Sequence, residues 1–145
     1  MAPWIDSQQA NEYGSGLLAG EAVRLRGLQE ADLPLLDTWW ADPRWSALQQ
    51  VLVRPRPERA TADMFRDWSV NTSAGSVGFS VCAIESGELI GHATLSGAQL
   101  PVRAATLALM IGPDHHGKGY GTDVVRTLTR YGFLEMGLNR IEIRV

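Results

Sequence analysis

A glycine-rich run, His115-His116-Gly117-Lys118-Gly119-Tyr120-Gly121-Thr122, has the residue types and spacing best suited to chemistry in this chain. Glycine lets the backbone approach a bulky ligand and adopt positive φ angles without strain. An apolar segment, residues 104–111, precedes the run, and a segment of helical periodicity, residues 123–136, follows it. Because the N–H groups at a helix start are unpaired and carry partial positive charge, this arrangement predicts a site for a phosphate or pyrophosphate.

Two well-known phosphate-binding patterns do not match the run. A Walker A loop has its lysine directly before a serine or threonine, whereas Lys118 lies between Gly117 and Gly119. The dinucleotide pattern Gly-x-Gly-x-x-Gly differs from the spacing here, in which every second residue from Gly117 to Gly121 is a glycine. The run is therefore a different kind of phosphate loop.

Strand and helix patterns surround the run and must position it. Expected strands cover residues 22–27, 77–84, 88–95, 104–111 and 141–145. Expected helices cover residues 32–41, 58–70 and 123–136. The segments between and before them are expected to be a hairpin turn at 85–88, a stiff proline connector at 54–57 and a flexible tail at 1–20. The order β-α-α-β-β-β-α-β predicts one α+β domain over residues 21–145, a mixed sheet flanked by helices.

Composition argues against several functional classes. The chain of 145 residues has a formal net charge of −3, which provides no electrostatic footprint for nucleic acid or an anionic membrane. The single Cys82 cannot form an internal disulfide, as is typical of cytoplasmic proteins. The first ten residues lack the features of a signal peptide, and no apolar run approaches the roughly 20 residues of a membrane span. We expect a cytoplasmic domain without nucleic-acid or membrane partners.

The glycine-rich run resembles the pyrophosphate loop of the GCN5-related N-acetyltransferase (GNAT) family, Gln/Arg-x-x-Gly-x-Gly/Ala. His116 stands at the Gln/Arg position, Gly119 at the first glycine and Gly121 at the Gly/Ala position. Other segments resemble family elements in the same order, and together the likeness covers residues 21–145. They are residues 22–33 (first strand and helix start of the ribosomal-protein, RimJ/RimL-like branch), 107–113 (fourth strand) and 131–145 (third helix end and fifth strand).

The resemblance implies transfer of an acetyl group from acetyl-coenzyme A directly to a primary amine, either a protein N-terminus or a small-molecule amine. It implies that the loop from His116 to Thr122 holds the pyrophosphate. It also implies that Leu109, Met110 and Ile111 align the pantetheine by strand-like hydrogen bonds. Two alternatives stay open: a non-catalytic acyl-CoA-binding or sensing module, and a structural interaction domain that kept the fold.

The amine must lose a proton, and the group that accepts it is not obvious. Relatives often carry a glutamate in the fourth strand, where this chain has Ala105 and Thr106, neither of which is a base. We expect proton transfer through water, with His92 as the first candidate protein group and Glu142 as the second. The alternatives are a packed or surface role for His92 and a solvent-facing strand position for Glu142.

Three tryptophans, Trp39, Trp40 and Trp45, occupy the region that forms one wall of the acceptor cleft in the resembled family. We expect one of them to face the cleft and the others to belong to the core, because large aromatic side chains mostly pack. His115 and His116 are sequence neighbours without acidic or cysteine residues at ligand spacing, so we expect no metal site.

The resemblance also marks a difference at the end of the sequence. Relatives continue past the fifth strand with a helix and two strands, which contribute an asparagine to the cofactor and a tyrosine or serine near the thiolate. This sequence ends at Val145. We expect either a longer natural protein or a covering of the exposed fifth strand by another chain, such as a second copy in a homodimer.

Overall fold

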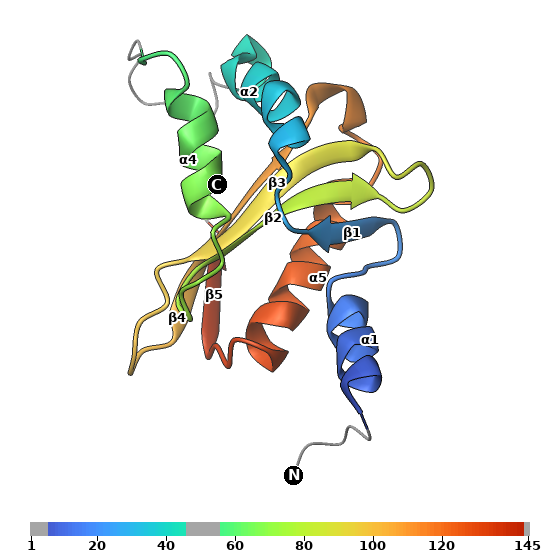
Figure 1. Cartoon of the computed structure of the whole chain (residues 1–145), viewed down its shortest axis with the longest axis vertical. Helices are drawn as coiled ribbons and strands as arrows, with labels where there is room; N and C mark the ends of the chain where they lie inside the picture. The colour runs from blue at the N-terminus through green and yellow to red at the C-terminus, as the bar shows by residue number, and fades with distance from the viewer. Residues whose placement is uncertain (1–5, 46–55, 144–145) are drawn as a thin grey trace.

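A five-stranded sheet in the order β1-β2-β3-β4-β5 forms the centre of the computed structural model, which describes residues 6–45 and 56–143 (Figure 1). The strands are β1 (Val23–Arg26), β2 (Val77–Ala83), β3 (Leu89–Ser96), β4 (Ala104–Ile111) and β5 (Arg140–Ile143). Neighbours from β1 to β4 are antiparallel, whereas β5 is parallel to β4. The predicted mixed sheet is confirmed.

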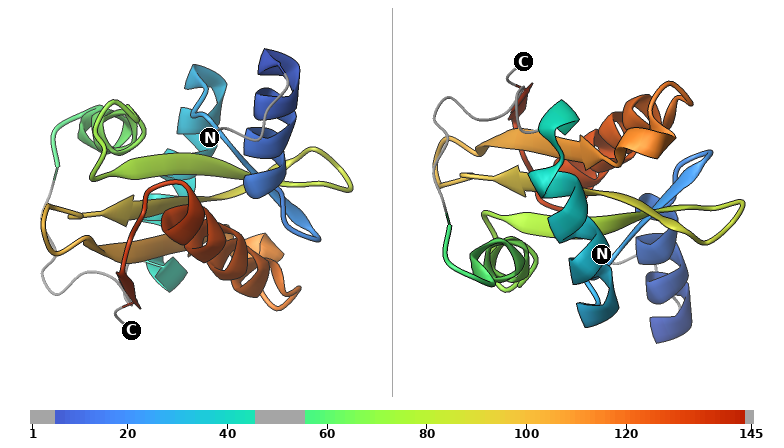
Figure 2. Two further views of the ribbon diagram at one scale, coloured as in Figure 1. Left: turned by 90° about the horizontal axis from the view of Figure 1, so that it is seen from below. Right: turned by 90° about the horizontal axis from the view of Figure 1, so that it is seen from above.

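Helices connect and cover the strands in the predicted order, with one addition before β1. They are α1 (Ser7–Leu17), the 3₁₀ turn η1 (Glu30–Asp32), α2 (Leu33–Ala41), α4 (Ala60–Trp68), the 3₁₀ turn η2 (Pro113–His115) and α5 (Tyr120–Leu134). The α5 and α4 helices lie on opposite sides of the sheet (Figure 2). None of the described helices is long and apolar enough to cross a membrane.

The face of the sheet beneath α5 holds the larger core. Val23 and Leu25 of β1 are buried there, as their alternation predicts, and Val124 and Leu128 of α5 are fully buried against the strands. Gly132 lets α5 pack closely on the sheet, because an added Cβ would lie 2.9 Å from the Ile141 side chain and would push it aside. The apolar residues of α5, which recur with helical periodicity, and those of the strands, which alternate, therefore pack into one apolar layer.

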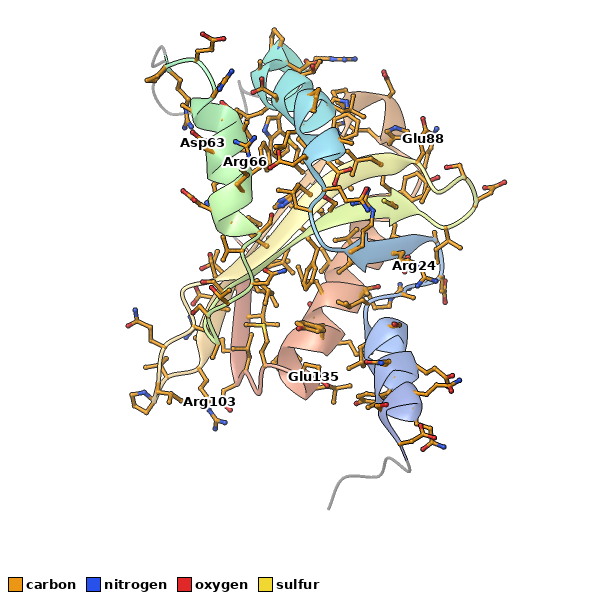
Figure 3. The ribbon with its side chains drawn as sticks, viewed as in Figure 1. Arg24, Asp63, Arg66, Glu88, Arg103 and Glu135 are labelled. Carbon is orange, nitrogen blue, oxygen red and sulfur yellow. The ribbon has the colours of Figure 1, made fainter. Side chains whose placement is uncertain are left out.

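The opposite face is covered by α4, with α2 packed beside it. Leu36 and Phe65 are almost fully buried in this second cluster, which also includes Met110 of β4. Arg66, on the side of α4 toward α2 (Figure 3), donates to the Glu30 carboxylate of η1 at 2.9 Å. This arrangement places α4 above the polar residues of β3.

The segment predicted as a flexible tail, residues 1–20, contains the helix α1 in the part that the structure describes. Asp6 caps α1 by accepting the Gln9 N–H at 3.0 Å, and Leu17 is buried at the other end. Arg130 of α5 donates to carbonyl oxygens at the C-terminal end of α1 and just after it, including that of Gly16. Long-range contacts therefore stabilise a helix whose own sequence is polar and contains glycine.

Asp123 in the first turn of α5 fixes that helix to the start of β1. Its carboxylate accepts the backbone N–H groups of Glu21, Ala22 and Val23 at 3.2, 2.8 and 3.0 Å. The side chain is buried, and Thr127 donates to the Asp123 carbonyl one turn later. The start of α5, and with it the glycine-rich loop, is thereby held at a defined place beside the sheet.

Several predicted boundaries shift by a few residues. The helix expected from Asp123 begins at Tyr120, and the helix expected over 58–70 is confined to Ala60–Trp68. The hairpin turn between β2 and β3 is confirmed, with the Ala83 N–H donating to the Glu88 carbonyl. Arg54 and Pro55 of the predicted connector, and Arg144 and Val145 of the predicted last strand, lie outside the described residues.

Candidate active site

The glycine-rich loop ends directly at the N-terminus of α5. Gly117 and Gly119 have φ angles of 74° and 82°, and Gly119 is the N-cap residue of the helix. A Cβ added to either glycine would meet no atom within 4 Å, so the backbone conformation, not crowding, requires glycine there. The first N–H groups of a helix have no intrahelical partner, so those at the start of α5 are suited to bind an anion.

A cavity of about 270 Å³, here called the loop cavity, lies between this loop and β4. Its lining residues are Trp45, Leu109, Ile111, His115, His116, Gly117, Gly119, Tyr120 and Gly121. The structure thus brings most of the predicted phosphate-binding residues together with two of the three predicted pantetheine residues. Lys118 and Thr122 are exposed and do not line the cavity.

The edge of β4 that faces the loop cavity carries backbone groups pointing away from β3. The Gly112 N–H donates to the Ile90 carbonyl, which sets the alternation along β4. Consequently Leu109 and Ile111 direct their N–H and C=O groups to the β5 side, beyond the last described pair, Leu107 with Ile143. The His116 ring lies at this edge, with Nε2 2.7 Å from the Ile111 carbonyl oxygen.

Met110 does not share this orientation. It lies opposite His92 in the β3–β4 register, where its backbone groups bond to β3, and its side chain is buried in the cluster beneath α2 and α4. The strand-like hydrogen bonds expected from three residues are therefore available from Leu109 and Ile111. Met110 instead belongs to the wall between the loop cavity and the opposite face of the sheet.

A second cavity of about 670 Å³, here called the front cavity, lies between α4 and the strands β3 and β4. Aromatic side chains line one side of it: Trp40, Trp45, Phe65 and Trp68. Hydroxyl side chains line the other: Thr72, Ser73, Ser76, Thr94, Ser96 and Thr106. Asp67 contributes a carboxylate. Leu109 and Trp45 line both cavities, so the two are adjacent.

Two of the three predicted tryptophans line the front cavity, rather than the single one expected. Trp40 and Trp45 have ring centroids 6.2 Å apart, and the indole N–H of each is buried without a hydrogen-bond partner in the described part of the chain. Trp39 is buried beneath η2 instead. Its ring leaves no room for a side chain at Gly112, and it contacts His115 edge-on at 6.1 Å.

His92 lies on the front-cavity side of β3 and is only 3% exposed. Its Nε2 is 2.7 Å from the Ser69 hydroxyl, and its ring packs against Phe65 at 5.0 Å. Burial lowers the pKa of His92 from 6.5 to about 4, although the nearby Asp32 carboxylate opposes this shift. The imidazole is therefore neutral near pH 7, as a proton acceptor must be, but its lowered pKa makes it a weak base.

Glu142 pairs in register with Thr106, which places both on the front-cavity side of the sheet. Its carboxylate forms a close ion pair with Arg140, and it is not among the described residues that line the cavity. Thr106, at the position of the family glutamate, does line the cavity, whereas Ala105 is buried in the core beneath α5. The structure thus brings His92, but not Glu142, to the cavity wall.

Sequence reasoning missed the polar residues around His92. Asp32 is buried. Its carboxylate accepts hydrogen bonds from two guanidinium nitrogens of Arg26, each at 2.8 Å, and from the Ser80 hydroxyl at 2.8 Å. Burial alone would raise the pKa of Asp32, but the hydrogen bonds from Arg26, the Gln29 N–H and Ser80 outweigh it and lower the pKa. The sequence shows Asp32 at the start of an expected helix, but it does not show that the distant Ser80 is its hydrogen-bond partner.

This arrangement can bind an anion at the loop, an extended chain along the β4 edge and a second molecule in the front cavity. A neutral histidine lies one strand away from Met110, beside the point where the cavities meet. The described residues contain no group of three or more histidine, cysteine or acidic side chains that could hold a metal ion. The site thus combines two adjacent cavities with a buried histidine on the wall of one of them.

Comparisons with known proteins agree with this geometry. Residues 22–145 match the model of the acetyltransferase (GNAT) domain. The uncharacterized N-acetyltransferase p20 of Bacillus licheniformis is 28% identical over 127 residues, which make up 86% of this chain and 70% of that protein.

Solved structures of two further proteins are similar in fold. An acetyltransferase of the GNAT family from Bacillus anthracis has a TM-score of 0.68 at 21% identity, covering 87% of this chain and 71% of that chain. A spermidine N-acetyltransferase from Vibrio cholerae, in complex with CoA and spermine, also has a TM-score of 0.68 at 21% identity, covering 83% and 69%.

Proposed function

The chain belongs to the acetyltransferase (GNAT) domain family, and from this premise we propose that it moves an acetyl group directly to a primary amine bound in the front cavity. As an N-acetyltransferase it uses acetyl-coenzyme A, whose thioester supplies the activated acetyl group. The single observation that carries the proposal is the contact between the cavities at Leu109 and Trp45. Two molecules bound on the two sides would meet there.

The residues present fit the cofactor. Gly117 and Gly119 keep the loop backbone open for a pyrophosphate at the start of α5. Leu109 and Ile111 offer outward-facing backbone groups to the pantetheine amides along the β4 edge. His116 shares this edge through its bond to the Ile111 carbonyl, so its ring must be accommodated beside the bound cofactor or displaced.

The front cavity supports an amine as the second substrate. Its described lining contains the Asp67 carboxylate and indole rings, both of which attract a cationic group. Direct transfer requires the amine to be neutral when it attacks, and His92, a neutral side chain on the wall of the front cavity, is our candidate to accept its proton. We assign the acceptor to the primary amines, whether of a peptide N-terminus or of a small molecule.

We extend the proposal to the RimJ/RimL-like branch and to the cytoplasm. The support for the branch is the motif at residues 22–33, which here forms β1 and η1. The support for the location is the buried, unpaired Cys82. Acetylation of a ribosomal-protein N-terminus, compared with acetylation of free polyamines, tests the branch assignment.

Turnover and binding tests address the proposal together. Acetyl-coenzyme A is incubated with a panel of peptides and small amines, and release of the free thiol is followed by a chromogenic reagent. We expect acetylation of at least one primary amine, confirmed by a mass increase of the amine. Binding of coenzyme A without any amine acetylation would contradict the enzymatic proposal and favour an acyl-CoA-binding module.

A further inference from the structure

One hydroxyl group on the wall of the front cavity belongs to a buried residue. Thr94 of β3 lines this cavity and is 8% exposed, whereas the other hydroxyl side chains of the described lining are half-buried or exposed. Thr94 lies two residues from His92, on the same face of β3. Water reaches the more exposed hydroxyls readily, so Thr94 depends most on a partner inside the cavity.

The Thr94 hydroxyl makes no hydrogen bond to any residue in the ranges 6–45 and 56–143 that the structure describes. Its oxygen is not sealed from solvent, unlike the indole nitrogens of Trp40 and Trp45, so it opens to the front cavity. A buried hydroxyl without a partner destabilises a protein. A molecule bound in the cavity can supply that partner.

The neighbours of Thr94 leave room beside it and place it near the junction of the two cavities. Its partners in the strand register are Gly78 of β2 and Ala108 of β4, which have little or no side chain. A Cβ at Gly78 would clash with the Trp68 carbonyl, so the end of α4 lies directly over that glycine. Ala108 is exposed and directly precedes Leu109, which lines both cavities.

We propose that Thr94 binds the nitrogen of the acceptor amine through its hydroxyl oxygen. This inference rests on the proposed function, because it requires an amine in the front cavity. A hydroxyl oxygen has two lone pairs that accept hydrogen bonds, so it can accept an N–H of the amine whether the amine is charged or neutral. The lone pair of the neutral nitrogen is then free to attack the acetyl group. Thr94 thus orients the nucleophile, and it neither gains nor loses a proton.

Kinetics with two different amines test this contact. The probes are n-butylamine, whose only polar group is the amine, and trialanine, which has a free N-terminus. Thr94→Val removes the hydroxyl and keeps the branched shape, and kcat/KM should fall about tenfold for both probes, as for the loss of one hydrogen bond. Thr94→Ser keeps the hydroxyl and should stay within about threefold of the wild type. Affinity for coenzyme A, measured by calorimetry, should be unchanged in both variants, because Thr94 does not line the loop cavity.

The melting temperature separates this role from a structural one. Because the hydroxyl has no partner in the described part of the chain, Thr94→Val should melt no lower than the wild type. Thr127→Val is the matched control. Thr127 is a buried threonine of α5, on the other side of the sheet, and its hydroxyl donates to the Asp123 carbonyl. In this control, kcat/KM for both probes should be unchanged.

Three results would overturn the assignment of Thr94. They are wild-type kinetics in Thr94→Val, a loss for trialanine alone, and a lower melting temperature accompanied by weaker binding of coenzyme A. The second would place the contact elsewhere on the acceptor, and the third would show a structural role. A wild-type protein that binds coenzyme A but acetylates neither probe nor any other amine would instead overturn the proposed function, and the assignment with it.

Discussion

At the scale of single residues, the burial of His92 links its chemistry to protein stability. Its folded pKa of about 4 lies below the unfolded value of 6.5. The unfolded chain therefore binds a proton at a pH where the folded chain does not, and stability falls as the pH drops from 6.5 to 4. At about 1.4 kcal/mol per pKa unit, the loss from this residue is roughly 3 kcal/mol.

Urea unfolding at pH 7 and at pH 4 measures this effect. We expect the free energy of unfolding of the wild type to fall by about 3 kcal/mol more than that of His92→Gln. The acid sensitivity of Asp32 is common to both proteins and cancels in the comparison. An equal loss in the two proteins would contradict the depressed pKa.

Gly119 gives a second prediction at this scale. Gly119→Asp places a carboxylate where the pyrophosphate is expected, so binding of coenzyme A should be lost. The matched control is Gly97→Asp, because Gly97 has a similar φ angle of 79° and equally open space but follows β3 at the far hairpin. Calorimetry should show unchanged affinity for the control. Equal losses in both variants would indicate backbone strain rather than anion repulsion.

Sequence patterns identified His92 and Gly119 but not the surroundings of His92. His92 and Thr94 alternate with Gly91, Ala93 and Leu95, and such alternation correctly assigns them to one face of β3. The pattern cannot tell whether that face meets water or another element. Here α4 covers it, so His92 is packed rather than at the surface.

At the scale of elements, the position of α5 depends on Asp123. Asp123→Ala should lower the free energy of unfolding by about 2–4 kcal/mol, because the buried Val23 N–H loses its acceptor and two other bonds are lost. The exposed Asp37 of α2 is a matched control, and Asp37→Ala should cost less than about 0.5 kcal/mol. Thermal or urea unfolding measures both variants, and equal stabilities would contradict the role of Asp123.

Elements defined by local periodicity were predictable, whereas those held by distant contacts were not. The limits of β4 and the apolar stripe of α5 follow from their own residues. The α1 helix does not, because its segment is polar and contains Gly14 and Gly16. Its stability comes from Arg130 and from burial of Leu17, which are separated from each other by most of the chain.

At the scale of the whole molecule, the arrangement of the two cavities was only partly predictable. The resemblance placed a cofactor loop, a fourth strand and aromatic residues in sequence order. It did not show that Trp45 and Leu109 would join the loop cavity to the front cavity. That junction depends on how α2, β4 and α5 pack, which no single segment encodes.

Because the two cavities are adjacent, we predict that the two substrates bind at separate sites and that the reaction occurs while both are bound. Thr106→Phe would fill the front cavity four residues along β4 from Met110, away from the glycine-rich loop. We expect kcat/KM for the amine to fall at least about tenfold, as for the loss of one good binding contact. Affinity for coenzyme A should stay within twofold, because Thr106 does not line the loop cavity.

Initial rates measured over both substrate concentrations complete this test. Direct transfer needs both molecules bound at once, so double-reciprocal plots should intersect in the wild type and in Thr106→Phe. Parallel lines would indicate a covalent acetyl-enzyme and would contradict transfer across the junction of the cavities. A loss of coenzyme A affinity equal to the loss for the amine would show that Thr106 affects a single shared site, not the front cavity alone.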